Sequence, residues 1–229
     1  MTSSHTDTDG TSFTTASVSP TANSLVLLFI LAYDEEGTPE ATSSITGTNW
    51  ANGLTWTLET SINSAHNTEA GTAKYMVYSA VAPSSVTGGT ITGNFSATHE
   101  KFLWKLVQVT DTATPDVVQS KANAGLNDVT VTLDATPDSG NGSVAFGAVS
   151  ENTSLTFSSN LTDLGYIFAE GTAPAYIGKG GYTNSSPPTA ALADVAPTGN
   201  TGAIYVEVGT AAASGMALDP IIILDDYTE

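Results

Sequence analysis

The chain contains no cysteine and no arginine, and only five lysines stand against 23 aspartates and glutamates in 229 residues. Without cysteine it can form neither a disulfide framework nor a thiolate metal site, so its stability has to come from packing and hydrogen bonds. The formal net charge is −18, and a few scattered lysines cannot neutralise a row of phosphates. We therefore expect no nucleic-acid partner and no attachment to anionic membranes.

Long apolar segments and a basic leader are also missing. The longest apolar run, residues 25–33, has about half the length that a membrane-spanning helix needs. Residues 1–11 are polar and lack the basic and apolar regions of a signal peptide. We expect no membrane insertion, and we interpret residues 1–11 as a flexible polar arm.

The surface is expected to consist of Thr, Ser, Asn and carboxylates. Charged residues make up 12% of the chain, compared with about 25% in an ordinary domain. A strong net negative charge suits a medium in which salt shortens the Debye length to about 3 Å, because self-repulsion is then screened. A halophilic or marine origin is one interpretation, and a virion or secreted protein kept soluble by its charge is the other.

Short runs rich in Val, Ile, Thr, Tyr and Phe recur between clusters of Gly, Pro, Asn and Ser, whereas helical periodicity is hard to find. This spacing predicts an all-β protein, an antiparallel two-sheet β-sandwich with almost no helix. The expected strands cover residues 12–18, 24–33, 54–62, 73–81, 90–95, 102–110, 116–120, 129–133, 143–150, 164–169, 175–179, 189–195 and 203–208.

The alternation of apolar and polar residues indicates which side chains face the core in some of these strands. Residues 54–58 and 129–133 each place their apolar side chains on one face, as period two requires for a half-buried strand. In residues 25–33 both faces are apolar, so this strand should either be central and covered on both sides or place one face in a subunit contact. We expect residues 12–209 to form one sandwich domain, followed by a separate segment, residues 210–229.

One stretch of the sequence resembles a known family. It contains Ser19-Pro20-Thr21-Ala22-Asn23-Ser24 before the apolar strand, and Gly53-Leu54-Thr55-Trp56 after it. These residues are similar to jelly-roll-like domains in virion surface proteins of tailed viruses of bacteria or archaea, such as head decorations, turrets and tail fibres. The resemblance extends over residues 12–209, through residues 75–78, 104–109 and 202–208.

The resemblance implies a jelly-roll-like sandwich at the virion surface, used for capsid structure or host attachment. It implies a homo-oligomer, with a trimer favoured, that contacts other virion proteins and host-surface glycans, and it carries no catalytic residues. A secreted or cell-surface carbohydrate-binding module is the alternative, and a glycan-degrading appendage enzyme is the second alternative.

No motif of a known enzyme is present. A nucleophile elbow of the form G-x-S-x-G does not occur. The histidines His5, His66 and His99 are expected in the polar arm, in a loop and at a strand entry. The carboxylates fall mainly in loops rather than as a pair across a concave strand, which glycoside hydrolysis would need. We therefore expect no enzymatic activity.

Two groups of residues fit a carbohydrate-binding surface, in which an aromatic ring lies beside amides. The first is Trp50 with Asn49 and Asn52, and the second is Tyr182 with Asn184. Core packing is the alternative role for Trp50.

No cofactor is expected, unless a calcium ion binds, since hard oxygen ligands are abundant and cysteine is absent. Asp7 and Asp9 resemble the start of a calcium loop, and Asp34, Glu35 and Glu36 form a second acidic group at a strand end. For both groups simple solvation is the alternative.

The last segment combines a proline, four apolar residues and two acids: Pro220, Ile221, Ile222, Ile223, Leu224, Asp225 and Asp226. Period two would place two apolar side chains on each face of a strand, and a sandwich edge covers only one face. We expect this segment to dock on a neighbouring subunit or another virion protein. An ordinary final strand of the domain is the alternative.

Overall fold

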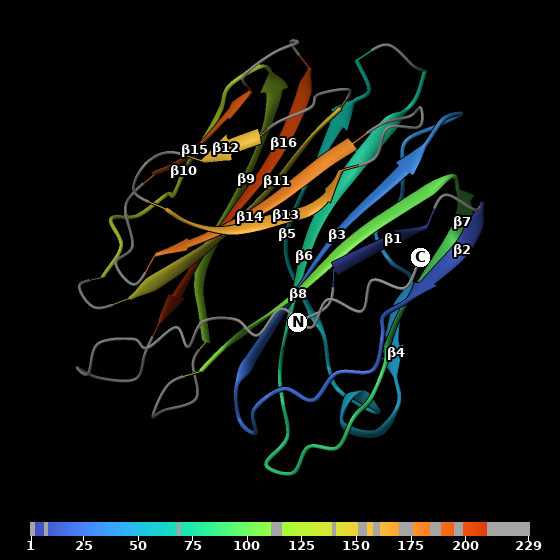
Figure 1. The fold of residues 1–229 in the computed structure, drawn as a ribbon, viewed down its shortest axis with the longest axis vertical. Coiled ribbons are helices and arrows are strands. Elements are labelled where there is room, and N and C mark those ends of the chain that lie inside the picture. Colours follow the sequence, from blue (N-terminus) through green and yellow to red (C-terminus); the bar gives the residue numbers. More distant parts are fainter. Residues whose placement is uncertain are drawn as a thin grey trace.

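The structure is a computed structural model that describes residues 3–6, 9–67, 70–110, 116–138, 141–150, 155–157, 161–169, 176–183, 189–194 and 199–209 (Figure 1). Within this part of the chain the protein is almost entirely β-structure, and every strand pairing is antiparallel. The helical element described is one 3₁₀ turn, η1 (Asn49–Ala51). No helix of the described residues has the length and hydropathy needed to span a membrane.

The first half of the chain contributes eight strands: β1 (Ser3–Thr6), β2 (Gly10–Thr14), β3 (Leu25–Asp34), β4 (Ser44–Gly47), β5 (Thr57–Ala65), β6 (Thr72–Val81), β7 (Ile91–His99) and β8 (Lys101–Val109). They form a five-stranded sheet, β1-β8-β3-β6-β5, and a three-stranded sheet, β2-β7-β4. In this half β1 pairs with β8, β2 with β7 and β3 with β6. This strand order is that of a jelly roll.

The second half repeats this order with eight further strands: β9 (Asp116–Leu126), β10 (Val129–Thr132), β11 (Gly142–Ser150), β12 (Leu155–Phe157), β13 (Thr162–Ala169), β14 (Tyr176–Thr183), β15 (Thr189–Asp194) and β16 (Asn200–Gly209). Its sheets are β9-β16-β11-β14-β13 and β10-β15-β12. Strand by strand, β9–β16 take the places of β1–β8. The described chain therefore confirms the predicted all-β, antiparallel, jelly-roll-like sandwich and adds a duplication, because two such jelly rolls follow each other along the chain.

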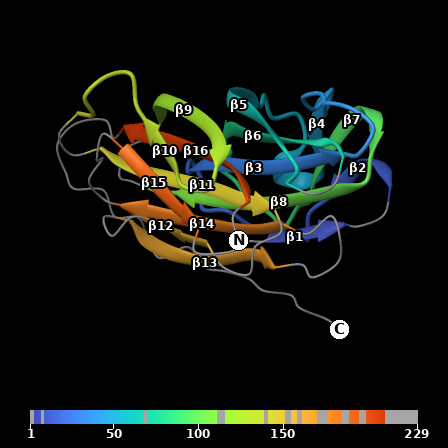
Figure 2. The same ribbon diagram turned by 90° about the horizontal axis from the view of Figure 1, so that it is seen from above.

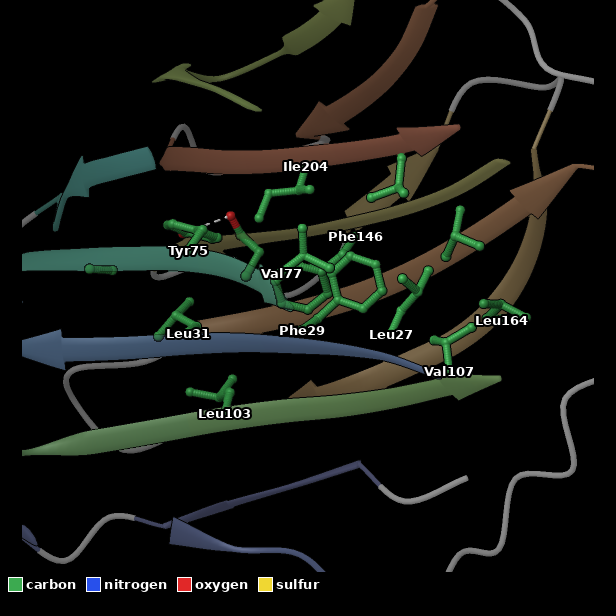
Figure 3. Packing of buried hydrophobic residues seen from close by; sticks show 14 of the residues in the cluster. Leu27, Phe29, Leu31, Tyr75, Val77, Leu103, Val107, Phe146, Leu164 and Ile204 are labelled. Atoms are coloured by element: carbon green, nitrogen blue, oxygen red, sulfur yellow. Dashed lines mark hydrogen bonds between the residues drawn. The ribbon is translucent and has the colours of Figure 1, made fainter. Parts of the chain in front are cut away.

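The four sheets lie in layers, with the two five-stranded sheets in the middle and the three-stranded sheets on opposite outer sides (Figure 2). Each jelly roll has its own core between its two sheets. A third, shared core lies between the five-stranded sheets, where Phe29 of β3 stacks on Phe146 of β11 with ring centroids 5.1 Å apart (Figure 3). Leu27, Val77 and Ile204 surround this pair.

Strand β3 confirms the expectation for the apolar run. It lies between β8 and β6, and its side chains alternate between two cores. Leu27 and Phe29 enter the shared core, whereas Leu28 and Ile30 enter the core of the first jelly roll. Such continuous apolarity is required because both faces of this sheet are covered.

The polar N-terminus differs from the flexible arm that its composition suggests. Ser3–Thr6 form β1 against residues 102–105 of β8, and Gly10 starts β2. A strand at a sheet edge needs main-chain hydrogen bonds rather than apolar side chains, so polar residues suffice there. The short strands β4 and β12 are also absent from the sequence-based expectation.

Residues 54–58 depart from their predicted alternation. Leu54 and Trp56 pack against the core of the first jelly roll, but Leu58 is 41% exposed. Pairing between β5 and β6 shifts by one residue after Leu58, and such a bulge interrupts the inward-outward alternation.

Candidate functional site

Trp50 is not available as a sugar-binding platform, because it is only 4% exposed and packs in the core of the first jelly roll. Its ring nitrogen Nε1 donates a hydrogen bond to the carbonyl oxygen of Val18, 2.8 Å away. Turn η1 turns the indole inward and so ties the loop before β3 to the loop after β4. The alternative role, core packing, is therefore the observed one.

The two asparagines beside Trp50 lie at the surface without an aromatic partner in that turn. Asn49 adopts a positive φ of 52°, and its side-chain amide donates to the carbonyl oxygen of Gly88. Asn52 is exposed at the end of η1. Asn49 thus holds two loops together, which is a structural task.

The second expected sugar-binding group is only partly described. Tyr182 lies in β14 and is half-buried against the shared core, so only part of its ring could meet a ligand. Asn184 lies outside the described residues, as do Asp7 and the segment from Pro220 to Leu224.

The members of the two acidic groups that the structure describes form no metal-binding cluster. Asp9 is exposed. In the second group, Asp34 Oδ1 accepts a hydrogen bond from the Glu36 amide at 2.9 Å, and Glu100 Oε2 accepts one from the Glu35 amide at 2.8 Å. In the described part of the chain no group of three or more His, Asp or Glu side chains is arranged to hold a metal. The hydrogen bonds shape the turn after β3.

The two histidines whose side chains are described are both buried. The His99 ring packs against Phe95 and Phe102, with centroids 4.8 and 5.5 Å away, and its Nδ1 lies 3.0 Å from the carbonyl oxygen of Ala97. The His66 ring meets Tyr33 and Tyr176 edge-on. Both environments are those of packed core residues.

Three of the five lysines are also buried: Lys101, Lys105 and Lys179. Lys179 Nζ lies 2.5 Å from Asp163 Oδ2, and Lys105 Nζ donates to the carbonyl oxygen of Leu164. Only Lys74 and Lys121 remain to contribute positive charge at the surface. The surface is consequently even more acidic than the composition implies.

A candidate binding surface that the sequence reasoning missed is the outer face of the sheet β2-β7-β4, here called the hydroxyl face. It carries uncharged polar side chains in two rows across the strands. Thr14 Oγ1 and Thr92 Oγ1 lie 2.9 Å apart, and Asn94 Nδ2 donates to Ser44 Oγ at 3.2 Å. The rows are Ser12–Asn94–Ser44 and Thr14–Thr92–Thr46.

Sheet geometry spaces these groups by about 4.8 Å across the strands and about 6.6 Å along them. Such an array presents hydrogen-bond donors and acceptors without net charge, which suits a polyhydroxylated ligand. Its signal was present in the sequence as the alternation of Ser12-Phe13-Thr14 and of Thr92-Gly93-Asn94-Phe95, whose polar members face outward.

Glu207 is the most unusual buried acid, since it is 0% exposed. Its carboxylate accepts hydrogen bonds from the Asp138 amide at 3.0 Å, from Asn141 Nδ2 at 2.6 Å and from Gln119 Nε2 at 2.5 Å. Three donors compensate the lost hydration of the carboxylate. The arrangement clamps the loop before β11 onto β16.

Comparisons of the chain with protein-family models, with curated proteins and with solved structures gave no match. The residues and the geometry of this chain are therefore the basis for any functional proposal.

Proposed function

We propose that this chain is a structural protein of the virion surface of a tailed virus, either a head decoration or turret or part of a tail appendage. The observation that carries the proposal is the pair of jelly rolls joined back to back through a shared core. Viral capsid proteins commonly use this winding. The sequence resemblance points to the same class of proteins.

The side chains support a structural role over a catalytic one. The hydrogen-bonded groups around Glu207 and around Gln108 fasten loops to strands. The buried histidines pack against aromatic rings. In this proposal the protein is not an enzyme, needs no cofactor and contacts other copies of itself and other virion proteins.

The acidic surface suits display on a particle. With three lysines buried, the exposed charge is almost wholly negative, which opposes non-specific aggregation of neighbouring particles. At high ionic strength the same charge is screened, so the proposal includes a high-salt habitat.

The proposal is tested on particles purified from a culture of the source organism. Antibodies raised against the recombinant chain should decorate intact particles in electron micrographs at regular positions, and pre-absorption with the recombinant chain should remove the label. Finding the chain only in the cell-free culture fluid, and not on particles, would overturn the proposal and favour the secreted module.

A second candidate function, carbohydrate binding, is favoured by the hydroxyl face. Replacing Thr92 and Asn94 by Ala should then weaken binding to host-envelope glycans at least several-fold. The matched control is Thr130→Ala with Thr132→Ala, two exposed residues on the outer sheet of the other jelly roll. Equal binding by both double variants would remove the hydroxyl face as the glycan site.

A further inference from the structure

Two Asn-Gly pairs occur in the chain, Asn52-Gly53 and Asn141-Gly142, and the structure places them in opposite surroundings. In such a pair the backbone nitrogen of the glycine can attack the side-chain amide of the asparagine. Glycine favours this attack, since it has no Cβ to obstruct the approach and its backbone rotates freely. Whether a pair reacts in the folded protein therefore depends on its exposure and its hydrogen bonds.

The first pair lies in a tight turn at the surface. Asn52 follows η1 with a φ of −73° and a ψ of 126°, and Gly53 has a φ of 74°. These angles are those of the two central residues of a type II turn, in which the second residue has to adopt a positive φ. Asn52 and Gly53 are both exposed, so water and hydroxide reach the reacting atoms of both residues.

Few contacts hold this turn in one arrangement. The Asn52 backbone amide donates to the carbonyl oxygen of Asn49 at 3.1 Å, but among the described residues the Asn52 side chain forms no hydrogen bond. A Cβ atom at Gly53 would meet no atom within 4 Å. The space around the turn therefore accommodates a ring formed between the two residues.

The turn also allows the motion that the reaction needs. At a ψ of 126° the Gly53 nitrogen is turned away from the side-chain amide of Asn52, so ring closure requires rotation of the peptide plane between the two residues. Such a rotation changes ψ of Asn52 and φ of Gly53 in opposite directions, and glycine accepts both signs of φ at no steric cost. The flanking residues, including the buried Trp50, can stay in place.

The second pair is held in a way that prevents this chemistry. Asn141 is 6% exposed, and its Nδ2 donates to Glu207 Oε1 at 2.6 Å. Gly142 is also buried and begins β11 opposite Val208 of β16. Rotation of this peptide plane would disturb the strand pairing and remove a donor from a buried carboxylate, which is unfavourable.

We propose that Asn52 is a site of spontaneous deamidation, whereas Asn141 stays intact in the folded protein. The Gly53 nitrogen loses its proton to hydroxide and bonds to Cγ of Asn52. The bond from Cγ to Nδ2 then breaks, and the leaving nitrogen takes a proton from water, which releases ammonia and regenerates hydroxide. The product is a five-membered succinimide ring.

Water opens this ring at either of its two carbonyl groups. Opening at one gives aspartate, and opening at the other gives isoaspartate, in which the main chain continues through the side-chain carbon. Overall one water molecule is consumed and one ammonia is released, so no oxidant, reductant or cofactor is needed. The chemistry is that of a charge-changing covalent modification.

The products change the turn in two ways. Both add a negative charge to a strongly acidic protein, and isoaspartate also lengthens the main chain by one carbon atom. Strand β4 leads into η1 through Thr48, so the new charge arises in the loop that follows one edge strand of the hydroxyl face. The charge in this loop therefore changes with the age of the protein.

The test follows both pairs in one sample of the full-length protein. The folded protein is incubated in mildly alkaline buffer made with heavy-oxygen water, and the same chain unfolded in urea is the reference, because neither pair is protected there. Each conversion leaves a heavy oxygen in the peptide, which peptide mass spectrometry detects, and chromatography separates isoaspartate from aspartate. At position 52 the folded protein should react at a rate within a few-fold of the unfolded chain, and at position 141 at least several-fold more slowly.

Asn52→Gln is the matched control, because its longer side chain cannot close a five-membered ring, and product at position 52 should be lost. An Asn52 that stays intact in the folded protein but reacts in urea would overturn the proposal, since the turn would then block the attack. Equal rates at both positions of the folded protein would also overturn it. Aspartate without isoaspartate would indicate direct hydrolysis of the side chain and would contradict the ring.

Discussion

Gln108 and Glu207 occupy the same position in the two jelly rolls, and each holds the loop before the central strand through one backbone amide. They differ in burial: Glu207 is fully buried and accepts a hydrogen bond from Gln119 of β9, whereas Gln108 is only partly buried. The same type of hydrogen bond, from a loop amide to a side-chain oxygen, therefore occurs in both jelly rolls. In the first the acceptor is an amide side chain near the surface, and in the second it is a buried carboxyl group.

The first prediction follows from this difference. Glu207→Ala would leave three donors without an acceptor in a buried site, so the free energy of unfolding should fall by about 3 kcal/mol or more. Gln108→Ala removes two hydrogen bonds near solvent and should cost about 1 kcal/mol or less. Denaturant titrations of both variants give the comparison, and equal losses would show that the two clamps are energetically alike.

Much of the fold could be predicted from the sequence, because period-two alternation and turn residues report local structure directly. Every expected strand overlaps an observed one. Strands β1, β4 and β12 were missed because each spans only three or four residues, too few to show a periodicity. The duplication was missed because few residues, such as Phe29 and Phe146, are the same in both halves, while the hydrogen-bonding pattern that reveals it involves residues far apart in the chain.

The candidate site was less predictable than the fold. Trp50 sits among polar residues in the sequence, so local composition suggested an exposed ring, but its partner Val18 comes from a distant loop. The members of the hydroxyl face could have been placed at the surface from the sequence, since they alternate with buried residues. Only the pairing of β2, β7 and β4 brings them into one array.

The second prediction concerns Tyr75, whose hydroxyl donates to the carbonyl oxygen of Ala148 at 3.0 Å across the shared core. Burial raises the pKa of Tyr75 above its ordinary value of 10.0. The folded protein therefore keeps a proton that the unfolded chain loses, and stability should decline as the pH rises above about 10, by up to about 1.4 kcal/mol per pH unit for this group.

Tyr75→Phe should cost about 1 kcal/mol at neutral pH, because one hydrogen bond is lost and the Ala148 carbonyl is left without it. Above pH 10 its stability should decline less steeply than that of the natural protein. Thermal melts between pH 7 and 11 measure both effects, and parallel curves would show that Tyr75 does not titrate on unfolding.

The third prediction concerns the close approach of the two halves at Gly202. A Cβ atom at this position of β16 would lie 2.4 Å from the ring of Tyr75, so Gly202→Ala should destabilise the protein by about 1–3 kcal/mol through overpacking. Gly125→Ala on β9 is the matched control, because its Cβ would meet Val129 at an ordinary 3.7 Å. Similar melting temperatures for the two variants would contradict the observed packing.

The fourth prediction is a gain of stability with monovalent salt. The net charge of −18 is spread over a surface with little positive charge, and screening weakens the repulsion that favours the unfolded chain. The melting temperature should rise from about 0.05 to 2 M sodium chloride. A flat profile would remove self-repulsion as a factor, and a rise with sulfate alone would indicate solvent exclusion instead.

The central claim is that two back-to-back jelly rolls form a structural unit of a virion surface. A density map of native particles, purified in the salt of their habitat, tests it most directly. The account predicts outward-facing density that fits two eight-stranded units with Phe29 and Phe146 stacked between their five-stranded sheets. Particles whose resolved surface proteins leave no density for this chain would contradict it.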